Sequence, residues 1–194
     1  MKIIKKIFAI IVSFFISFII FYNITSEFIS FFYQGSFKFE QILYVLIYFG
    51  QSVLIYFFIQ FICKENITQK QINLIWCLYF CVMLILLFGR PYIGLAINLN
   101  PLTIFELNYY SFFQNFFNLV LFIPIGFIFK KNNSKIRVLI IAILVVLAIE
   151  TLQLITMRGI FDIVDILLDA TGIFIGFLIS PYVPQNLKFS LFNQ

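Results

Sequence analysis

The chain has 194 residues, of which 63% are apolar and only 11% are charged. Soluble domains are about 45–50% apolar and about 25% charged, so a water-soluble globule of this size could not bury so much apolar surface. These proportions exclude a water-soluble enzyme and predict a membrane protein with several spans. The net charge of +5 comes from Lys and Arg residues spread between apolar runs, so we expect no nucleic-acid partner.

Six apolar segments follow one another along the chain, each bounded by polar or turn residues. The expected helices cover residues 7–22, 41–62, 72–89, 112–129, 136–157 and 163–182. Basic residues precede the first segment, as in a signal peptide, but no small-residue cleavage motif follows it, so we expect an uncleaved helix. Residues 28–33 either extend this helix or lie in the membrane interface. The pattern predicts an all-α polytopic membrane protein, a bundle of about six transmembrane helices.

The distribution of Lys and Arg predicts the orientation of this bundle. Cytoplasmic segments of membrane proteins carry an excess of basic residues. With a cytoplasmic N-terminus, ten of the thirteen basic residues fall inside: Lys2, Lys5, Lys6, Lys64, Lys70, Lys130, Lys131, Lys135, Arg137 and Lys188. Lys38, Arg90 and Arg158 remain outside. Six spans return the C-terminus to the cytoplasm, so we expect both termini there.

The chain offers few metal ligands. It contains no His, the commonest metal ligand and general base near neutral pH. Its three cysteines, Cys63, Cys77 and Cys81, lack the spacing of a metal site and are expected to be buried apolar residues. We therefore expect no metal and no cofactor.

Polar residues form a stripe on each of the last three expected helices. Each stripe lies in the outer half only, and its members share one helix face: Ser111, Asn115 and Asn118; Glu150, Gln153 and Met157; Asp162, Asp165 and Asp169. At about 1.5 Å per residue, Asn118, Glu150 and Asp169 each lie about 10 Å below the outer end of their helix. The three side chains are expected to meet at one level.

These polar groups need partners. A charged residue near the bilayer centre costs about 2.5–3.5 kcal/mol, so the stripes should face the bundle interior. Two carboxyl groups at one depth cannot both ionise cheaply, so either one holds a proton or a cation lies between them. Arg158 is close in sequence to Asp162 and Asp165, and we expect it to pair with one of them across the turn between the last two helices.

Three roles remain open for the polar cluster. It is helix-to-helix glue, a binding site for a ligand or headgroup, or a catalytic site. Interhelical polar contacts in membranes contribute on average about 0.6 kcal/mol, which accounts for a single Asn better than for several acidic residues. The candidate ligand-binding residues are Asn115, Asn118, Glu150, Gln153, Arg158, Asp162, Asp165 and Asp169. Glu150, Asp165 and Asp169 are also the candidate catalytic residues.

Four further residues are expected to shape the helices. Pro124 lacks an N–H and, together with Gly126, should kink the fourth helix just below Asn118. Such a kink is either an ordinary feature of membrane helices or a means of shaping a cavity. Gly172 and Gly176 form a small-xxx-small motif that allows two helix backbones to approach closely.

These residues also carry a family resemblance, which covers about residues 98–180. The motifs are Asn98-Leu-Asn-Pro101, then Asn118-Leu-Val-Leu-Phe-Ile-Pro124-Ile-Gly126-Phe127, then Glu150-Thr-Leu-Gln153, Arg158, Phe161-Asp162-Ile-Val-Asp165, and Gly172 with Gly176. In order and spacing they resemble the VanZ-like family of bacterial membrane proteins. The chain departs from the family pattern at Val164, often Asp, and at Asp169, usually Asn.

The resemblance implies a multi-pass protein of the bacterial cytoplasmic membrane, in a family associated with resistance to teicoplanin-type glycopeptides. It implies a VanZ-like core over 98–182, preceded by a three-helix extension over 1–97 whose first two helices look lineage-specific, the whole forming one integrated domain. Expected partners are membrane lipids and a lipid-linked cell-wall precursor or glycopeptide at the outer leaflet.

Three functions remain open. The first is binding or modification of an outer-leaflet envelope component. The second is a membrane-embedded hydrolase or transferase that acts on a lipid-linked glycan or phosphoester with paired carboxylates. The third is a proton-coupled transporter, which would need polar residues in the inner helix halves as well, where the last three helices are apolar.

Overall fold

The structure, a computed structural model, describes residues 2–33, 35–63, 65, 67–90, 92–105, 108–129 and 132–183. These residues form helices joined by short connections, with one pair of two-residue strands. They divide into two compact units, the first up to residue 90 and the second from Tyr92 onward. Of the residues used to predict orientation, Lys64, Lys130, Lys131 and Lys188 lie outside the described residues.

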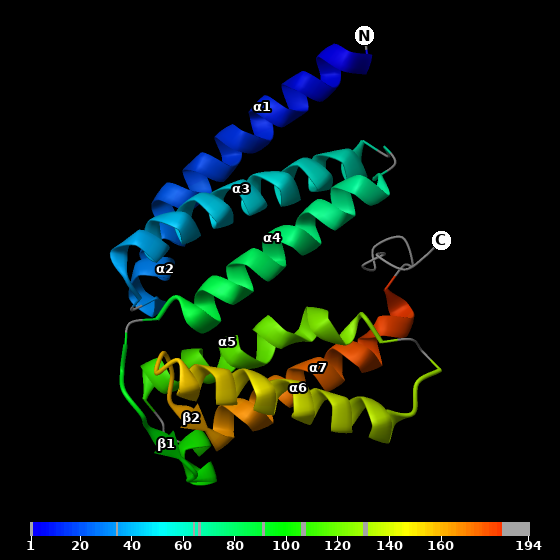
Figure 1. Cartoon of the computed structure of the whole chain (residues 1–194). Coiled ribbons are helices and arrows are strands. Elements are labelled where there is room, and N and C mark those ends of the chain that lie inside the picture. Colours follow the sequence, from blue (N-terminus) through cyan, green and yellow to red (C-terminus); the bar gives the residue numbers. More distant parts are fainter. Residues whose placement is uncertain are drawn as a thin grey trace. The chain divides into compact units, whose positions relative to one another are not determined.

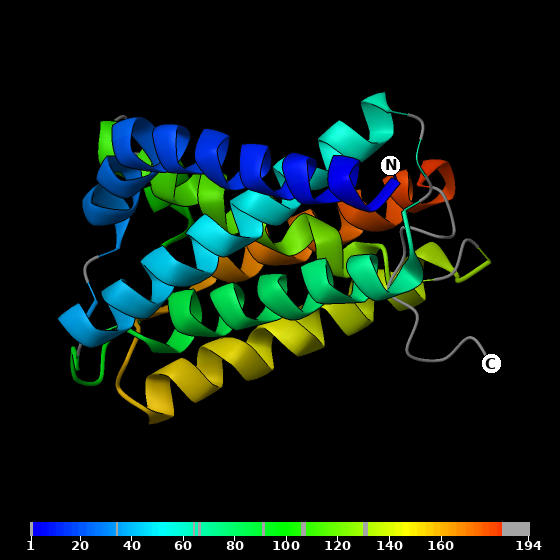
Figure 2. The same cartoon turned by 90° about the horizontal axis from the view of Figure 1, so that it is seen from above.

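Within its described residues, the first unit is helical throughout. It contains α1 (Lys2–Ile20), the π-helical turn η1 (Phe21–Thr25), α2 (Ser26–Phe32), α3 (Phe37–Ile62) and α4 (Gln69–Phe88). The long helix α3 packs against both α1 and α4 (Figures 1 and 2). Part of the core of this unit is a cluster of Ile29, Tyr33 and Leu43. The Tyr33 hydroxyl donates a hydrogen bond to the carbonyl of Gly89 at 2.6 Å.

The ends of two of these helices differ from the expected bounds for local reasons. Thr68 and Gln71 form a capping box, in which the Thr68 N–H donates to Gln71 Oε1 at 2.8 Å, so α4 begins at Gln69 rather than at 72. The path of α1, η1 and α2 is helical without interruption up to Phe32. Residues 28–32 therefore extend the first helix, which was one of the two alternatives.

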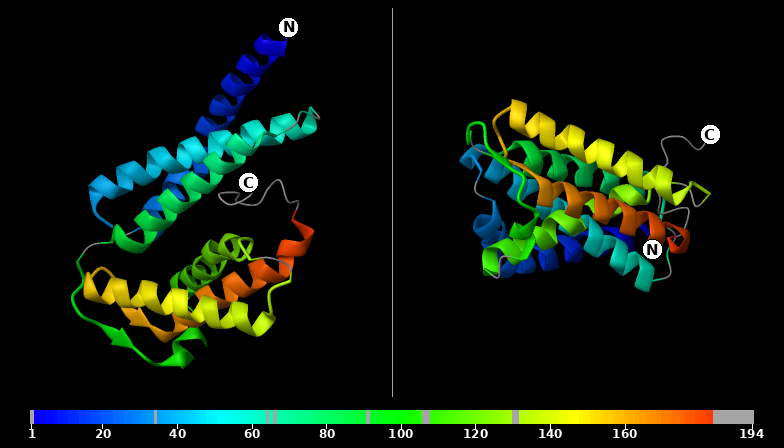
Figure 3. Two further views of the ribbon diagram at one scale, coloured as in Figure 1. Left: turned by 45° about the vertical axis from the view of Figure 1, so that its right-hand side comes forward. Right: turned by 90° about the horizontal axis from the view of Figure 1, so that it is seen from below.

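In its described residues, the second unit contains three long helices and the strand pair. Its elements are β1 (Ile97–Asn98), the 3₁₀ helix η2 (Pro101–Phe105), α5 (Tyr109–Gly126), α6 (Lys135–Ile155), β2 (Phe161–Asp162), α7 (Ile163–Ile179) and the 3₁₀ turn η3 (Ser180–Tyr182). Helix α7 packs against both α5 and α6 (Figures 1 and 3). It therefore brings residues of all three helices together.

Glycines make the contact between α5 and α7 close. A Cβ atom added at Gly172 would collide with the backbone carbonyl of Leu119, and one added at Gly176 would collide with that of Ile123. On the other helix, a Cβ at Gly126 would meet the carbonyl of Ile173. The small residues thus let the two backbones approach in the manner common between membrane helices.

Helix α5 begins and ends earlier than the expected span of 112–129. Asn108 caps its start, because its Oδ1 accepts a hydrogen bond from the N–H of Ser111 at 2.6 Å. The helix ends at Gly126, two residues after Pro124. The Phe127 N–H then donates to the Pro124 carbonyl at 3.0 Å in a tighter turn, as expected where a proline disturbs the regular helix.

The helices have the length and composition of membrane spans. Among the described residues, five stretches are long and apolar enough to cross a bilayer: Ile4–Ser30, Phe37–Ile62, Gln69–Phe88, Lys135–Ile155 and Ile163–Tyr182. Large apolar side chains such as Phe8, Ile11 and Phe15 are more than 60% exposed, which suits lipid rather than water. The chain is an all-α protein of the membrane type, and Ser111–Gly126 is a shorter apolar helix.

Candidate functional site

A short strand pair ties the segment before α5 to the turn between α6 and α7. β1 and β2 are parallel, with Ile97 opposite Phe161 and Asn98 opposite Asp162. Two further backbone bonds extend this attachment, from the Phe161 N–H to the Ala96 carbonyl at 3.0 Å and from the Ile93 N–H to the Met157 carbonyl at 2.9 Å. The segment from Ile93 to Asn98 is therefore held against the turn that carries Arg158 and Asp162.

The backbone of this turn contains a strained residue. Met157 has a φ of 55°, in the left-handed region that residues other than glycine rarely adopt. Its carbonyl accepts the bond from Ile93, and its sulfur accepts one from the Tyr92 hydroxyl. Strain of this kind is maintained only where the surroundings determine the conformation, and it is common near functional sites.

Asp162 uses both carboxylate oxygens within the protein. Oδ1 accepts the N–H of Val164 at 2.8 Å and so caps the start of α7. Oδ2 accepts the side-chain amide of Asn98 at 2.9 Å. These two bonds give Asp162 a structural part in fixing β1, β2 and α7 to one another.

Glu150 is the buried carboxyl group of α6. It is 3% exposed, and its Oε2 accepts a hydrogen bond from the N–H of Asp162 at 3.3 Å. Gln153, one turn further along, is equally buried. A Cβ atom at Gly159 would approach the Gln153 side chain to 3.1 Å, so the turn packs directly on this amide.

The third polar contact joins α5 to α7. The side-chain amide of Asn118 donates to Asp165 Oδ1 at 2.6 Å. Asp169, one turn further along α7, is 3% exposed. Carboxyl and carboxamide groups from three helices thus lie within one compact unit, and the buried face of α7 continues beyond them with apolar residues and glycine.

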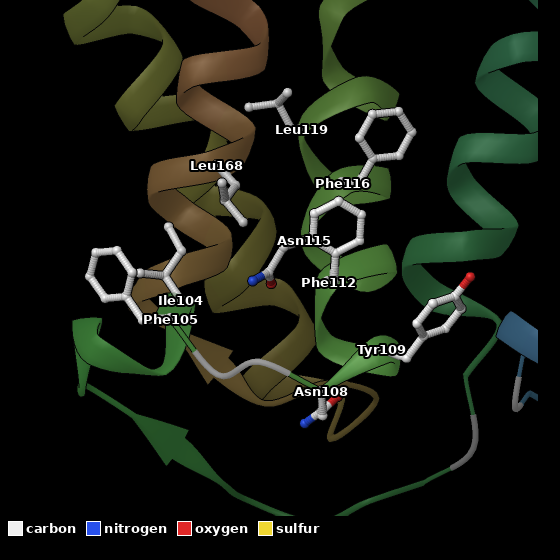
Figure 4. A pocket seen from close by; sticks show the side chains of 9 residues that line it. All are labelled: Ile104, Phe105, Asn108, Tyr109, Phe112, Asn115, Phe116, Leu119 and Leu168. Carbon is white, nitrogen blue, oxygen red and sulfur yellow. The ribbon is translucent and has the colours of Figure 1, made fainter.

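An open groove of about 500 Å³ lies between η2, α5 and α7 in the same unit (Figure 4). It is lined by Ile104, Phe105, Asn108, Tyr109, Phe112, Asn115, Phe116, Leu119 and Leu168. The walls are mainly apolar and aromatic. The Asn115 amide points from α5 toward the side of the groove formed by Ile104 and Leu168 (Figure 4).

The arrangement offers two different surfaces to a ligand. Asn115 presents a carboxamide in the groove. Asn118 follows it by about one helical turn on α5, and its partner Asp165 precedes the groove residue Leu168 by about one turn on α7. The groove itself provides apolar contact. Apolar walls with a few convergent polar groups are the usual composition of a small-molecule site.

The structure places every candidate residue in the second unit. Two hydrogen bonds join candidate residues of different elements. Asn118 bonds to Asp165, and Glu150 bonds to the backbone of Asp162, whereas Asn115 lines the groove. The Arg158 N–H donates to the Gln153 carbonyl at 3.0 Å. The pairing of the Arg158 side chain with a carboxylate stays a prediction, as does the meeting of Asn118, Glu150 and Asp169 at one level.

Two features of the site were not among the candidate residues. Asn98, which the motif contained without a role, is the partner of Asp162. The groove residues of η2, Ile104 and Phe105, and Leu168 of α7 were missed because they are ordinary apolar residues. Pro101, at which η2 begins, was the one available signal in the sequence, since proline favours the first turn of a helix.

In a comparison with protein families, the chain matches the VanZ/LLP1 family over residues 42–184. No curated protein and no solved structure matches the chain. The match begins in α3, so α3 and α4 belong to the shared region, which the motifs from Asn98 onward did not indicate. It covers well over half of the sequence and includes all candidate site residues, and the chain therefore belongs to the VanZ/LLP1 family.

Proposed function

We propose that this chain is a six-span protein of the bacterial cytoplasmic membrane with both termini in the cytoplasm. The five long apolar helices and α5 supply the six spans. The Lys and Arg distribution supports this orientation. In this topology the polar cluster lies in the outer half of the membrane, beside the outer leaflet.

In this position, the cluster binds or modifies an envelope component, either a lipid-linked wall precursor or a glycopeptide. The observation that carries the proposal is the burial of Glu150 in a hydrogen-bonded polar cluster, in a unit that also contains an apolar groove. Buried ionisable groups inside membranes are costly and usually serve function. By binding such a component, the protein would contribute to resistance against teicoplanin-type glycopeptides.

Helix glue alone accounts poorly for this arrangement. A neutral amide such as Gln153 joins helices at a lower desolvation cost than a carboxyl group. The unit instead buries Glu150 and Asp169 together with Gln153. Maintaining two buried carboxyl groups is easier to understand if a ligand uses them.

The enzyme alternative uses the same residues. Glu150 with Asp165 or Asp169 would act as acid and base on a glycan or phosphoester bond. The burial of Glu150 in the same unit as the buried Asp169 is the specific observation behind this second function. Binding requires no catalytic step, so we prefer it to the enzyme alternative.

The transporter alternative is weakened by the buried face of α6. From the start of α6, that face carries the apolar residues Val138, Ala142 and Val146, and then Glu150. A proton pathway across the membrane needs polar groups or water along its length. On the buried face of α6, the polar residues begin only at Glu150.

Native mass spectrometry of the purified protein from its bacterial membrane tests the function. We expect a lipid-linked component to copurify with the wild type and to be lost in Glu150→Gln. Thr151→Val is the matched control, since this exposed neighbour only donates to the Leu147 carbonyl. Equal retention in wild type and Glu150→Gln contradicts the proposal, and conversion of the component by wild type alone identifies an enzyme.

A further inference from the structure

Residues 92–105, which precede α5, expose apolar side chains where a loop in water would expose polar ones. No charged residue occurs from position 91 to position 105. Large apolar side chains that are more than 60% exposed recur along the whole segment: Tyr92, Leu95, Ile97, Leu99, Leu102 and Phe105. Apolar surface gathered in this way marks contact with a membrane or with another protein.

The polar side chains of the segment are used within the protein. Asn98 donates to Asp162 Oδ2 at 2.9 Å, although its two neighbours in sequence are exposed apolar residues. Asn100 Oδ1 accepts the N–H of Leu102 at 3.1 Å. The Thr103 hydroxyl donates to the carbonyl of Asn100 at 2.9 Å. The segment therefore directs its polar side chains to the protein and its apolar side chains outward.

The backbone of the segment is also hydrogen-bonded at several points. The N–H of Ile93 donates to the Met157 carbonyl at 2.9 Å, and that of Asn100 donates to Asn98 Oδ1 at 3.1 Å. The pairing of β1 with β2 adds further bonds, and Pro101 has no N–H to satisfy. A backbone whose polar groups are bonded within the protein can enter a region that is poor in water.

The segment lies at the end of a membrane span and beside its first turns. β1 pairs with β2, whose two residues come immediately before α7. η2 packs against α7, and its Ile104 lines the same groove as Leu168 of α7 (Figure 4). Leu168 lies about 8 Å along the helix from Ile163, the first residue of α7. Amphipathic segments in the plane of a membrane reach a similar depth, about 5–10 Å below the headgroups.

We propose that residues 92–105 form an in-plane membrane segment, whose exposed apolar side chains insert among the acyl chains of the leaflet beside the polar cluster. A lipid surface is the partner because exposed aromatic residues continue on the membrane helix that follows, where Tyr109 and Phe112 are 77% and 63% exposed. Tyr92 and Tyr109, which flank the segment, suit the headgroup level, where tyrosine is enriched. Asn100, at the turn between β1 and η2, stays at that level, which water reaches.

The insertion connects the lipid to the polar cluster. The strand that contacts lipid on one side holds Asp162 through Asn98 on the other side, and the Asp162 N–H donates to Glu150. Lipid contact therefore helps to fix the cluster without adding a ligand group to it. The leaflet is the outer one in the orientation proposed above, but the insertion itself does not depend on that orientation.

Tryptophan quenching in proteoliposomes tests the insertion. Trp76, the only tryptophan of the chain, is replaced by Phe, and a single Trp is then introduced by Leu99→Trp or Leu102→Trp. Asn132→Trp is the matched control, because Asn132 is exposed in the connection between α5 and α6, where positions 130–135 hold only Lys, Asn and Ser. The two quenchers are phosphatidylcholine brominated on its acyl chains and iodide in the water phase.

We expect the brominated lipid to remove about half of the fluorescence of both segment variants, as for a ring among the upper acyl chains. Iodide should quench them several-fold less than it quenches Asn132→Trp. Iodide quenching equal to that of the control, without lipid quenching, would show a surface in water and overturn the proposal. Quenching by neither agent would show that a second copy or another protein covers the segment, which also overturns it.

Leu95→Trp replaces either segment variant if thermal unfolding shows that it does not fold. The outcome is independent of the Glu150→Gln experiment. A native component that depends on Glu150, together with iodide quenching at the segment, would leave the proposed function in place and remove the inserted segment. Lipid quenching at the segment without any bound component would do the reverse.

Discussion

Glu150 is the residue at which the buried face of α6 changes from apolar to polar. Up to Val146 the buried residues of that face are apolar and need only packing contacts, not hydrogen-bond partners. From Glu150 onward it needs hydrogen-bond partners, and the backbone N–H of Asp162 is one of them. A neutral amide at position 150 could also accept this bond, so the bond itself does not explain why the residue is acidic.

A comparison of two amide substitutions separates charge chemistry from helix glue. We expect Glu150→Gln to abolish function while the protein still folds, because the lost group is the carboxyl that meets the ligand. Asp169→Asn should be tolerated or stabilising, because it removes one of two buried carboxyl groups. Expression, melting temperature and glycopeptide susceptibility of both variants are the measurements.

The opposite ranking has a clear meaning. If the polar cluster were only helix glue, Gln at position 150 would keep its hydrogen bonds and both substitutions would look mild. Function close to wild type in Glu150→Gln would therefore remove the carboxyl group from the proposed site.

Arg158 gives a second test at the level of single residues. If its guanidinium neutralises Asp165, Arg158→Ala should lower function and destabilise the fold by about 1–3 kcal/mol, because a partly buried carboxylate loses its partner. Adding Asp165→Asn should recover part of this loss, since Asn keeps an oxygen for the bond from Asn118. Thermal unfolding of the two single variants and the double variant measures the coupling. Strictly additive losses would show that the pair does not form.

Among the elements, the helices could be predicted from sequence and their exact ends could not. Apolar runs predict helices in a membrane protein because every backbone polar group must be bonded within its own segment. The ends depend on single side chains, such as Asn108 at the start of α5 and Thr68 before α4. The π turn η1 has no sequence signal that separates it from the helix around it.

The candidate site shows the same division. Helical spacing alone placed Asn118 and Asp165 on polar faces, and the structure joins them directly. The pairing of β1 with β2 brings Asn98 to Asp162 across 64 positions of sequence. Two-residue strands leave no alternation pattern, so this attachment is visible only in three dimensions.

The close contact between α5 and α7 gives a prediction for an element pair. We expect Gly176→Ala to destabilise the protein by about 1–3 kcal/mol, because the added methyl group meets the backbone carbonyl of Ile123 and the helices must move apart. Gly50→Ala is the control on α3, where the added carbon comes no closer than 4.0 Å to Leu78. Melting temperatures in one detergent compare the two, and an equal effect of both substitutions would contradict the close approach.

At the scale of the whole molecule, the site has an outer-leaflet location only if the orientation is correct. We expect both termini in the cytoplasm, with ten of the thirteen basic residues on the inner side. Single cysteines in a chain freed of Cys63, Cys77 and Cys81 report this orientation. A membrane-impermeant thiol reagent should label cysteines at Ser36 and Asn100 in intact cells, and one at Asn133 only after permeabilisation.

The position of Asn133 decides the matter because it precedes α6, whose other end carries Glu150 and Gln153. Labelling of Asn133 from outside would place the start of α6 at the outer surface and the polar cluster near the cytoplasm. The ligand would then have to come from the inner leaflet, where lipid-linked precursors are also exposed but glycopeptides are not. Protection of Asn133 in intact cells, together with labelling at Asn100, instead puts Asn98, Asp162 and the groove on the side at which both proposed ligands are accessible.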